Sequence, residues 1–144
     1  MSTFADSSAV VKLYADEDGQ DIVRALENLV LAQIARVEVP AAIWRKTRAG
    51  QLGATSATVL VADFEADFFG THDEPPRFAS VTLGVALLDD AAALSATRGL
   101  RAYDAIQLAA ARGAAAADPT CRTFAAFDRS LRAAAAAEGF ALIP

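Results

Sequence analysis

The stretch TFADSSAVVKLYADEDG, from Thr3 to Gly19, begins with a short apolar segment and then places a carboxylate at Asp6, where the chain should be entering a core. Ser2–Ala5 is predicted to form a short buried strand. Ser8–Tyr14 is predicted to form a helix, with the two serines that follow Asp6 as candidate N-caps. Because a buried carboxylate is costly unless something pairs with it, the acid at this junction needs a physical reason.

The composition favours one domain that spans residues 1–144, because 54% hydrophobic and 22% charged residues can build a single sizeable core. Cys121 is the one cysteine, so no intramolecular disulfide can form. The N-terminal residues lack a signal-peptide pattern, and no apolar run approaches the roughly 18 residues of a membrane helix. We therefore expect a soluble protein of the cytoplasm.

The net charge of -5 does not by itself exclude a nucleic-acid partner. A basic surface usually marks such proteins. However, if some of the carboxylates form a metal site, bound divalent cations offset their charge. The location of the acids therefore matters more than their number.

Along the chain, short apolar runs alternate with segments of helical periodicity, which favours an α/β domain with a parallel sheet. Pro40 lies inside one helical segment, which it is expected to begin or to kink. After the first strand and helix, further strands are predicted at 29–32, 121–127 and 140–144, and further helices at about 20–28, 34–48, 56–69, 80–96, 100–111 and 129–138.

Four acids interrupt apolar patterns. Asp6 and Asp128 each follow an apolar strand directly, where open α/β sheets build their ligand crevices. Glu38 lies one turn after Ile34 on an apolar helix stripe, and Asp104 lies one turn from Leu108. The sequence therefore predicts carboxylates at one edge of the sheet and on the helices beside it.

These acids have two interpretations. In the simpler one, the two strand-end acids cap the helices that follow, while Glu38 and Asp104 pair with arginines such as Arg36 or Arg101. In the other, all four carboxylates converge in one cleft, where like charges repel unless protons or metal ions neutralise them.

The chemistry of the donors points to Mg²⁺ or Mn²⁺ as the neutralising ion, since these hard cations prefer carboxylate and water oxygens. Zinc is disfavoured, because His72 and Cys121 are the only softer ligands outside the methionine. His72 lies in a polar loop, and Cys121 begins a predicted strand.

At this point the chain resembles a known family. ADSSAVVKLYADE around Asp6, ARVEVPAAIWRK around Glu38, GLRAYDAIQLAAA around Asp104 and TFAAFDRSLRAAAAAEGF around Asp128 are similar to the acidic motifs of PIN domains, in the order found in VapC-type toxin ribonucleases. The resemblance implies a central parallel sheet flanked by helices and a Mg²⁺- or Mn²⁺-dependent endoribonuclease. It also implies that these four acids are the catalytic and metal-binding residues.

Further expectations follow from the same resemblance. The partners would be an RNA substrate and a VapB-like antitoxin, in a homodimer or a toxin–antitoxin hetero-oligomer. Metal-activated water would hydrolyse the phosphodiester to 5′-phosphate and 3′-hydroxyl ends. Ser8 could hold Asp6 by a hydrogen bond. Ala126 departs from the family pattern, because many relatives carry Ser or Thr two residues before the last acid.

Two sets of residues are candidates for binding those partners. An antitoxin segment could dock on apolar residues of the early helices, which the alternative assigns to the core or a homodimer contact. That set is Val11, Leu13, Ile43, Trp44 and Leu52. The candidates for RNA backbone contacts are Arg45, Lys46, Arg48, Arg98 and Arg101.

Other functional classes fit less well. A phosphoacceptor domain needs a lysine on a late strand, whereas the only lysines are Lys12 and Lys46, both on early helices. The chain has neither a G-x-S-x-G elbow nor a phosphate-binding loop of the G-x-x-x-x-G-K-[ST] type. The remaining alternative is a catalytically silent PIN-like module that binds RNA or protein, and its usual mark would be the loss of one of the four acids.

Overall fold

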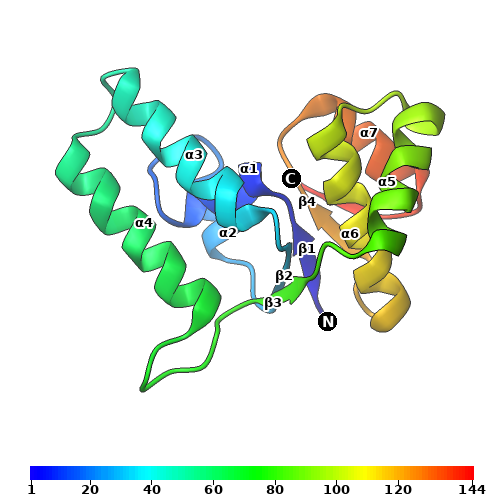
Figure 1. Ribbon diagram of the computed structural model, residues 1–144, viewed down its shortest axis with the longest axis horizontal. Coiled ribbons are helices and arrows are strands. Elements are labelled where there is room, and N and C mark those ends of the chain that lie inside the picture. Colours follow the sequence, from blue (N-terminus) through cyan, green and yellow to red (C-terminus); the bar gives the residue numbers. More distant parts are fainter.

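The computed structural model describes all 144 residues and is built around a five-stranded, fully parallel sheet with strand order β3-β2-β1-β4-β5. Figure 1 shows the strands between two groups of helices. The strands are β1 (Thr3–Ala5), β2 (Leu29–Ala32), β3 (Ala79–Val81), β4 (Thr123–Ala125) and β5 (Ala141–Ile143).

The helices alternate with the strands along most of the chain, as the sequence pattern predicts. A short 3-10 helix, η1 (Val11–Leu13), continues the first one. The α-helices are α1 (Ser7–Val10), α2 (Gln20–Arg24), α3 (Ala35–Arg48), α4 (Ala54–Phe69), α5 (Val85–Arg98), α6 (Ala102–Ala117) and α7 (Arg129–Ala137).

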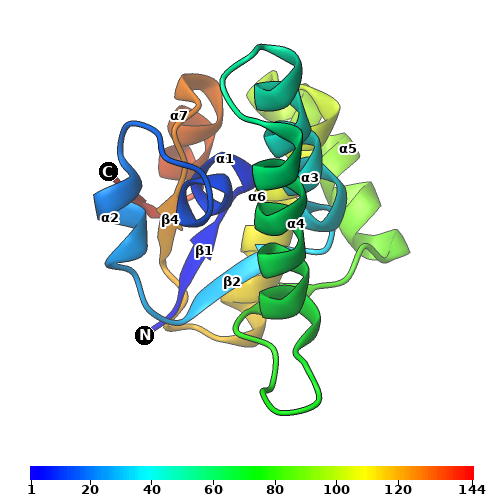
Figure 2. The same ribbon diagram turned by 90° about the vertical axis from the view of Figure 1, so that its left-hand side faces the viewer.

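Each face of the sheet has its own hydrophobic core. Phe4 and Phe124 are fully buried and point toward α5, α6 and α7, where their rings stack with centroids 5.3 Å apart. On the other face, Ala5 joins Ile43 of α3 and Phe64 of α4. Figure 2 looks at this second side, with α4 in the foreground beside β2. Because both faces are covered, consecutive residues of the central strands are buried or half-buried instead of alternating between buried and exposed.

Strand register brings the carboxyl ends of β1 and β4 together. Ala5 pairs with Ala125 in parallel, so the residues that follow these two strands leave the same edge of the sheet. This edge is where an open parallel sheet forms its ligand crevice. Asp6 follows β1 directly, but β4 ends at Ala125 and not at residue 127 as predicted, so Asp128 is separated from it by Ala126 and Phe127. Both acids still leave the sheet at the same rim, as predicted.

The structure corrects several predicted boundaries. The helix expected from Ser80 begins only at Val85, because residues 79–81 form β3 and pair with β2. A three-residue edge strand that is largely exposed leaves no periodic signal in the sequence. The helix predicted to end at residue 111 continues to Ala117, since Ala114 and Ala115 are buried against the core.

Early helices also differ from expectation. The segment predicted as one helix over Ser8–Tyr14 divides into α1 and η1, and the predicted helix 20–28 ends at Arg24. Pro40 neither begins nor interrupts α3, which runs through it from Ala35 to Arg48. No helix of the chain combines the length and hydropathy needed to cross a bilayer.

Candidate active site

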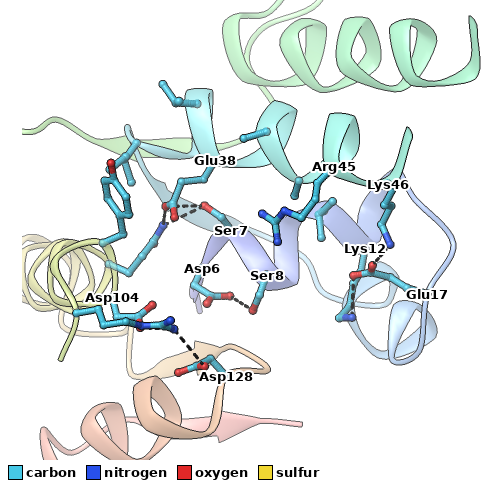
Figure 3. Close-up of a pocket in the computed structure, with 18 of the residues that line it drawn as sticks. Asp6, Ser7, Ser8, Lys12, Glu17, Glu38, Arg45, Lys46, Asp104 and Asp128 are labelled. Carbon is cyan, nitrogen blue, oxygen red and sulfur yellow. Dashed lines mark hydrogen bonds and ion pairs between the residues drawn. The ribbon is translucent and has the colours of Figure 1, made fainter. Parts of the chain in front are cut away.

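All four predicted acids line one pocket, which has a volume of about 840 Å³ and lies at the carboxyl edge of the sheet. Asp6 follows β1, Glu38 lies on α3, Asp104 lies on α6, and Asp128 lies between β4 and α7. Figure 3 shows the four side chains directed toward a common space. The sequence thus predicted correctly that residues far apart in the chain meet here.

Asp6 is both a helix cap and a pocket residue. Its Oδ1 accepts hydrogen bonds from the backbone N–H of Ala9 at 3.0 Å and from Ser8 Oγ at 2.7 Å. The side chain of Asp6, not the serines proposed as caps, therefore caps α1. Its Oδ2 has no partner within the protein. The predicted hydrogen bond from Ser8 is confirmed.

Burial dominates the electrostatics of Asp6, which is only 4% exposed. Desolvation raises its pKa to about 7. The hydrogen bonds from Ser8 and Ala9 oppose this rise, and the charges of Glu38 and Asp104 add to it. This carboxyl group therefore holds its proton to near-neutral pH when no cation is bound.

Glu38 is held by neutral hydrogen-bond donors instead of an arginine. Its Oε1 accepts from Ser7 Oγ at 3.1 Å and from Gln107 Nε2 at 2.7 Å, while its Oε2 has no partner. The pairing with Arg36 is wrong, because the Arg36 guanidinium lies 4.6 Å from the centre of the Phe69 ring. Desolvation raises the pKa of Glu38, and the charge of Asp104 adds to the rise.

Asp104 and Asp128 share one arginine. Arg101 approaches Asp104 Oδ2 at 3.4 Å and Asp128 Oδ1 at 3.9 Å, and its own side chain is 83% exposed. Asp128 also caps α7, because its Oδ2 accepts from the Leu131 N–H at 2.9 Å. Burial and the charge of Asp128 raise the pKa of Asp104, although Arg101 opposes the shift. Both simpler roles predicted for these two acids are therefore present.

Capping and pairing leave part of the carboxylate set without partners. Oxygens of Asp6, Glu38 and Asp104 remain free while a second oxygen of the same group is bonded. These hard oxygen donors suit Mg²⁺ or Mn²⁺ in kind, and a divalent cation would offset the burial and the mutual repulsion that raise their pKa values. As the side chains stand, no three of them are grouped closely enough to coordinate one ion.

Sequence reasoning missed two residues that hold the site together. Gln107 of α6 is 3% exposed and donates to Ser7 Oγ at 3.0 Å as well as to Glu38, so the three side chains form a closed network. Its own Oε1 is buried without a partner. Gln107 lies three residues after Asp104, on the same helix face, and that spacing was the available signal.

Other candidates lie away from the carboxylates. Cys121 is buried in the core beside Phe4 and Phe124, and His72 is exposed in the loop before β3. Among the proposed docking residues, Val11 and Ile43 are 5% and 0% exposed, so both belong to the core. Leu52 is half-buried and lines a second pocket of about 620 Å³.

The central, fully parallel sheet flanked by helices is a PIN-like α/β fold. No family model and no curated protein matches the chain. Among solved structures, PAE2754 from Pyrobaculum aerophilum superposes with a TM-score of 0.65 at 20% identity, covering 99% of this chain and 83% of that one. VapC20 of Mycobacterium tuberculosis, a sarcin-ricin loop cleaving toxin, superposes with a TM-score of 0.64 at 16% identity, covering 96% and 95%.

Proposed function

We propose that the protein is a metal-dependent endoribonuclease and the toxin of a type II toxin–antitoxin pair. The observation that carries the proposal is the convergence of Asp6, Glu38, Asp104 and Asp128 in one pocket. Carboxylates gathered in a partly buried pocket repel one another, and a bound divalent cation is the simplest explanation for their convergence. The similarity of fold to the toxin VapC20 supports the same class of activity.

In this proposal the four carboxylates hold Mg²⁺, or Mn²⁺ in its place. When bound, such an ion lowers the pKa of water and stabilises the negative charge that develops on the phosphate oxygens. The chain's own contribution is orientation. Ser8 and the Ala9 N–H fix Asp6, while Ser7 and Gln107 fix Glu38, so that the second oxygen of each carboxylate stays free.

Arg101 has a defined place in this scheme. It is the only cation within 4 Å of any of the four carboxylates and touches Asp104 and Asp128. Because Arg101 is largely exposed, it can swing away from these acids at little cost. We infer that it neutralises part of the site until a metal ion arrives.

The experiment is a cleavage assay on purified protein with structured and single-stranded RNA. We expect cleavage with Mg²⁺ or Mn²⁺ and none after addition of a chelator. Asp6→Asn should bind RNA without cutting it, and Glu65→Gln on the exposed side of α4 serves as the control. Wild-type protein that binds RNA but cuts none with either metal would instead support the silent RNA-binding module.

The partner in this proposal is a VapB-like antitoxin, which would keep the ribonuclease inactive in the cytoplasm. The second pocket, between η1 and the α3–α4 pair, offers half-buried Tyr14, Leu52 and Leu60 to an amphipathic segment. Co-expression with the product of an adjacent small open reading frame tests this. We expect that product to bind and to relieve toxicity; toxicity that persists in its presence would remove the antitoxin from the proposal.

A further inference from the structure

The pocket that holds the four carboxylates has a second, basic end. Lys12, Arg45 and Lys46 line the same pocket, and Figure 3 shows them on the opposite side from Asp104 and Asp128. The proposed metal site uses only the acidic end of the pocket, so the basic end has no role in it.

Helix geometry sets the spacing between the two ends. Glu38 and Arg45 lie on α3 about two turns apart, or roughly 10 Å along the axis, and therefore share one face. The pocket residues between them are Ala41 and Ala42, whose side chains end at Cβ. The wall of α3 between the acidic and the basic end is therefore low enough for an extended chain to pass.

Lys12 and Lys46 are fixed in place by one acid. Glu17 forms ion pairs with both, and the Lys12 Nζ, 2.9 Å from Glu17 Oε1, also lies 4.2 Å from the centre of the Phe127 ring. Burial alone would raise the pKa of Glu17, but the bonds from Lys46 and Lys12 lower it below its usual value. Because one carboxylate faces two lysines and Arg45, this end keeps a net positive charge.

Arg45 is the unpaired member of the group. It makes no hydrogen bond or ion pair within the chain, and in Figure 3 its guanidinium is directed into the pocket. A guanidinium fork matches the two oxygens of a phosphate, and it keeps its charge at any accessible pH. An exposed arginine that stays unpaired beside an acidic cluster is available to an anionic ligand.

The structure shows which of the basic residues predicted to contact the RNA backbone face the pocket and which do not. Arg48 follows Arg45 on α3 but lines neither pocket, and Arg98 pairs with Glu138 at 2.9 Å on the far side of the sheet. Arg101 is engaged by the carboxylates themselves. Arg45 and Lys46 are therefore the two predicted backbone contacts that face the pocket and make no ion pair with the four carboxylates.

We propose that the basic end of the pocket is a phosphate subsite, in which Arg45 contacts a backbone phosphate next to the one that is cut and Lys12 and Lys46 supply a fixed positive field. The inference rests on the proposed function and adds the place where the RNA backbone is held. The RNA chain would pass from this subsite to the carboxylates over the small side chains of Ala41 and Ala42.

The first test measures binding without catalysis. A short, fluorescently labelled single-stranded RNA is titrated with protein in chelator, and anisotropy is recorded at several salt concentrations. We expect Arg45→Gln to weaken binding about tenfold at low salt. The slope of log K against log salt should fall by about 0.7, the value for one lost phosphate contact on a single strand.

The matched control is Arg36→Gln. Arg36 lies nine residues before Arg45, or about two and a half turns, and therefore on the opposite face of the same helix. The substitution removes the same charge as Arg45→Gln, but Arg36 does not line the pocket. Equal affinities and equal salt slopes for the two variants would overturn the subsite.

The second test is a gain of binding. Glu17→Gln removes the acid that neutralises the two lysines, so we expect tighter RNA binding and a steeper salt slope, whereas Glu65→Gln on α4 should change neither. Binding by Glu17→Gln that equals the Glu65→Gln control would contradict the proposed role of the lysines.

Kinetics keep this inference distinct from the proposed function. In a protein that cuts RNA, Arg45→Gln should raise KM several-fold and leave kcat near wild type, since the contact is made in both the ground state and the transition state. Cleavage with an unchanged KM overturns the subsite alone. RNA binding that depends on Arg45 without any cleavage overturns the ribonuclease and supports the subsite.

Discussion

The acidic and the basic end of the pocket solve the same electrostatic problem differently. At the basic end, Glu17 bridges Lys12 and Lys46, and its pKa is lowered, so the charges stabilise one another. At the acidic end, burial and mutual repulsion raise the pKa of Asp6 to about 7. A bound cation would offset this unfavourable environment, which is the role that the proposed function gives it.

The largest effect should follow removal of one charge at the acidic end. Asp6→Asn or Asp104→Asn is expected to abolish detectable RNA cleavage, because each weakens the hold on a metal ion. Asn also caps helices well, so Asp6→Asn should fold. Thermal melting without metal should show unchanged or raised stability. Residual cleavage combined with a large loss of stability would show instead that these acids serve the core.

A smaller but still clear effect is expected at Gln107. Gln107→Leu removes the donor that orients Glu38 and leaves Ser7 as the only side chain bonded to that carboxylate. Residues that hold a metal ligand in place typically contribute about 10- to 100-fold to affinity or activity. We expect a loss of that size in kcat and in Mn²⁺ affinity with a nearly unchanged melting temperature. A wild-type kcat for Gln107→Leu would mean that the hydrogen bonds among Ser7, Glu38 and Gln107 have no role in catalysis.

The free energy of unfolding should depend on pH through Asp6 at the acidic end. The native Asp6 carboxyl keeps its proton up to about pH 7, whereas an unfolded chain releases it near its ordinary value of 3.8. Since the native state then binds more protons, its free energy of unfolding falls as pH rises through that window. Denaturant titrations in chelator should show a shallower fall for Asp6→Asn. Parallel curves for the two proteins would contradict the burial argument.

The smallest effect concerns Arg101. This side chain is 83% exposed, so its ion pairs should contribute less than about 1 kcal/mol to stability. Arg101→Gln should leave the melting temperature within a degree or two of wild type while binding Mn²⁺ more tightly, because a competing cation is gone. Arg122→Gln, an exposed arginine near the opposite edge of the sheet, is the control. A weaker Mn²⁺ affinity in Arg101→Gln would mean that the arginine assists the site.

The two ends also differ in how far the sequence predicted them. Asp6 and Asp128 were accessible to sequence reasoning, because an acid that closely follows an apolar strand has a defined place in a parallel sheet. Glu38 and Asp104 were identified by helix spacing. Spacing along one helix shows which residues share a face, but it does not show which other element meets that face.

The missed features all depend on contacts between elements. Gln107 and Ser7 meet Glu38 only because α6, α1 and α3 converge, and Arg45 differs from Arg48 only by its position relative to the pocket. Strand β3 escaped detection because a three-residue, largely exposed edge strand has no periodic pattern. The fold class and the acids thus followed from local pattern, whereas the support and the basic end required the tertiary structure.

The most direct test of the central claim is a calorimetric titration of the purified, chelator-treated protein with Mn²⁺. If the four carboxylates form a cation site, wild-type protein should bind Mn²⁺ with release of protons near neutral pH, since Asp6 is partly protonated there. Asp104→Asn should bind at least tenfold more weakly, and Arg45→Gln should match wild type. Absence of Mn²⁺ binding by the wild-type protein, or equal binding by Asp104→Asn, would contradict the account.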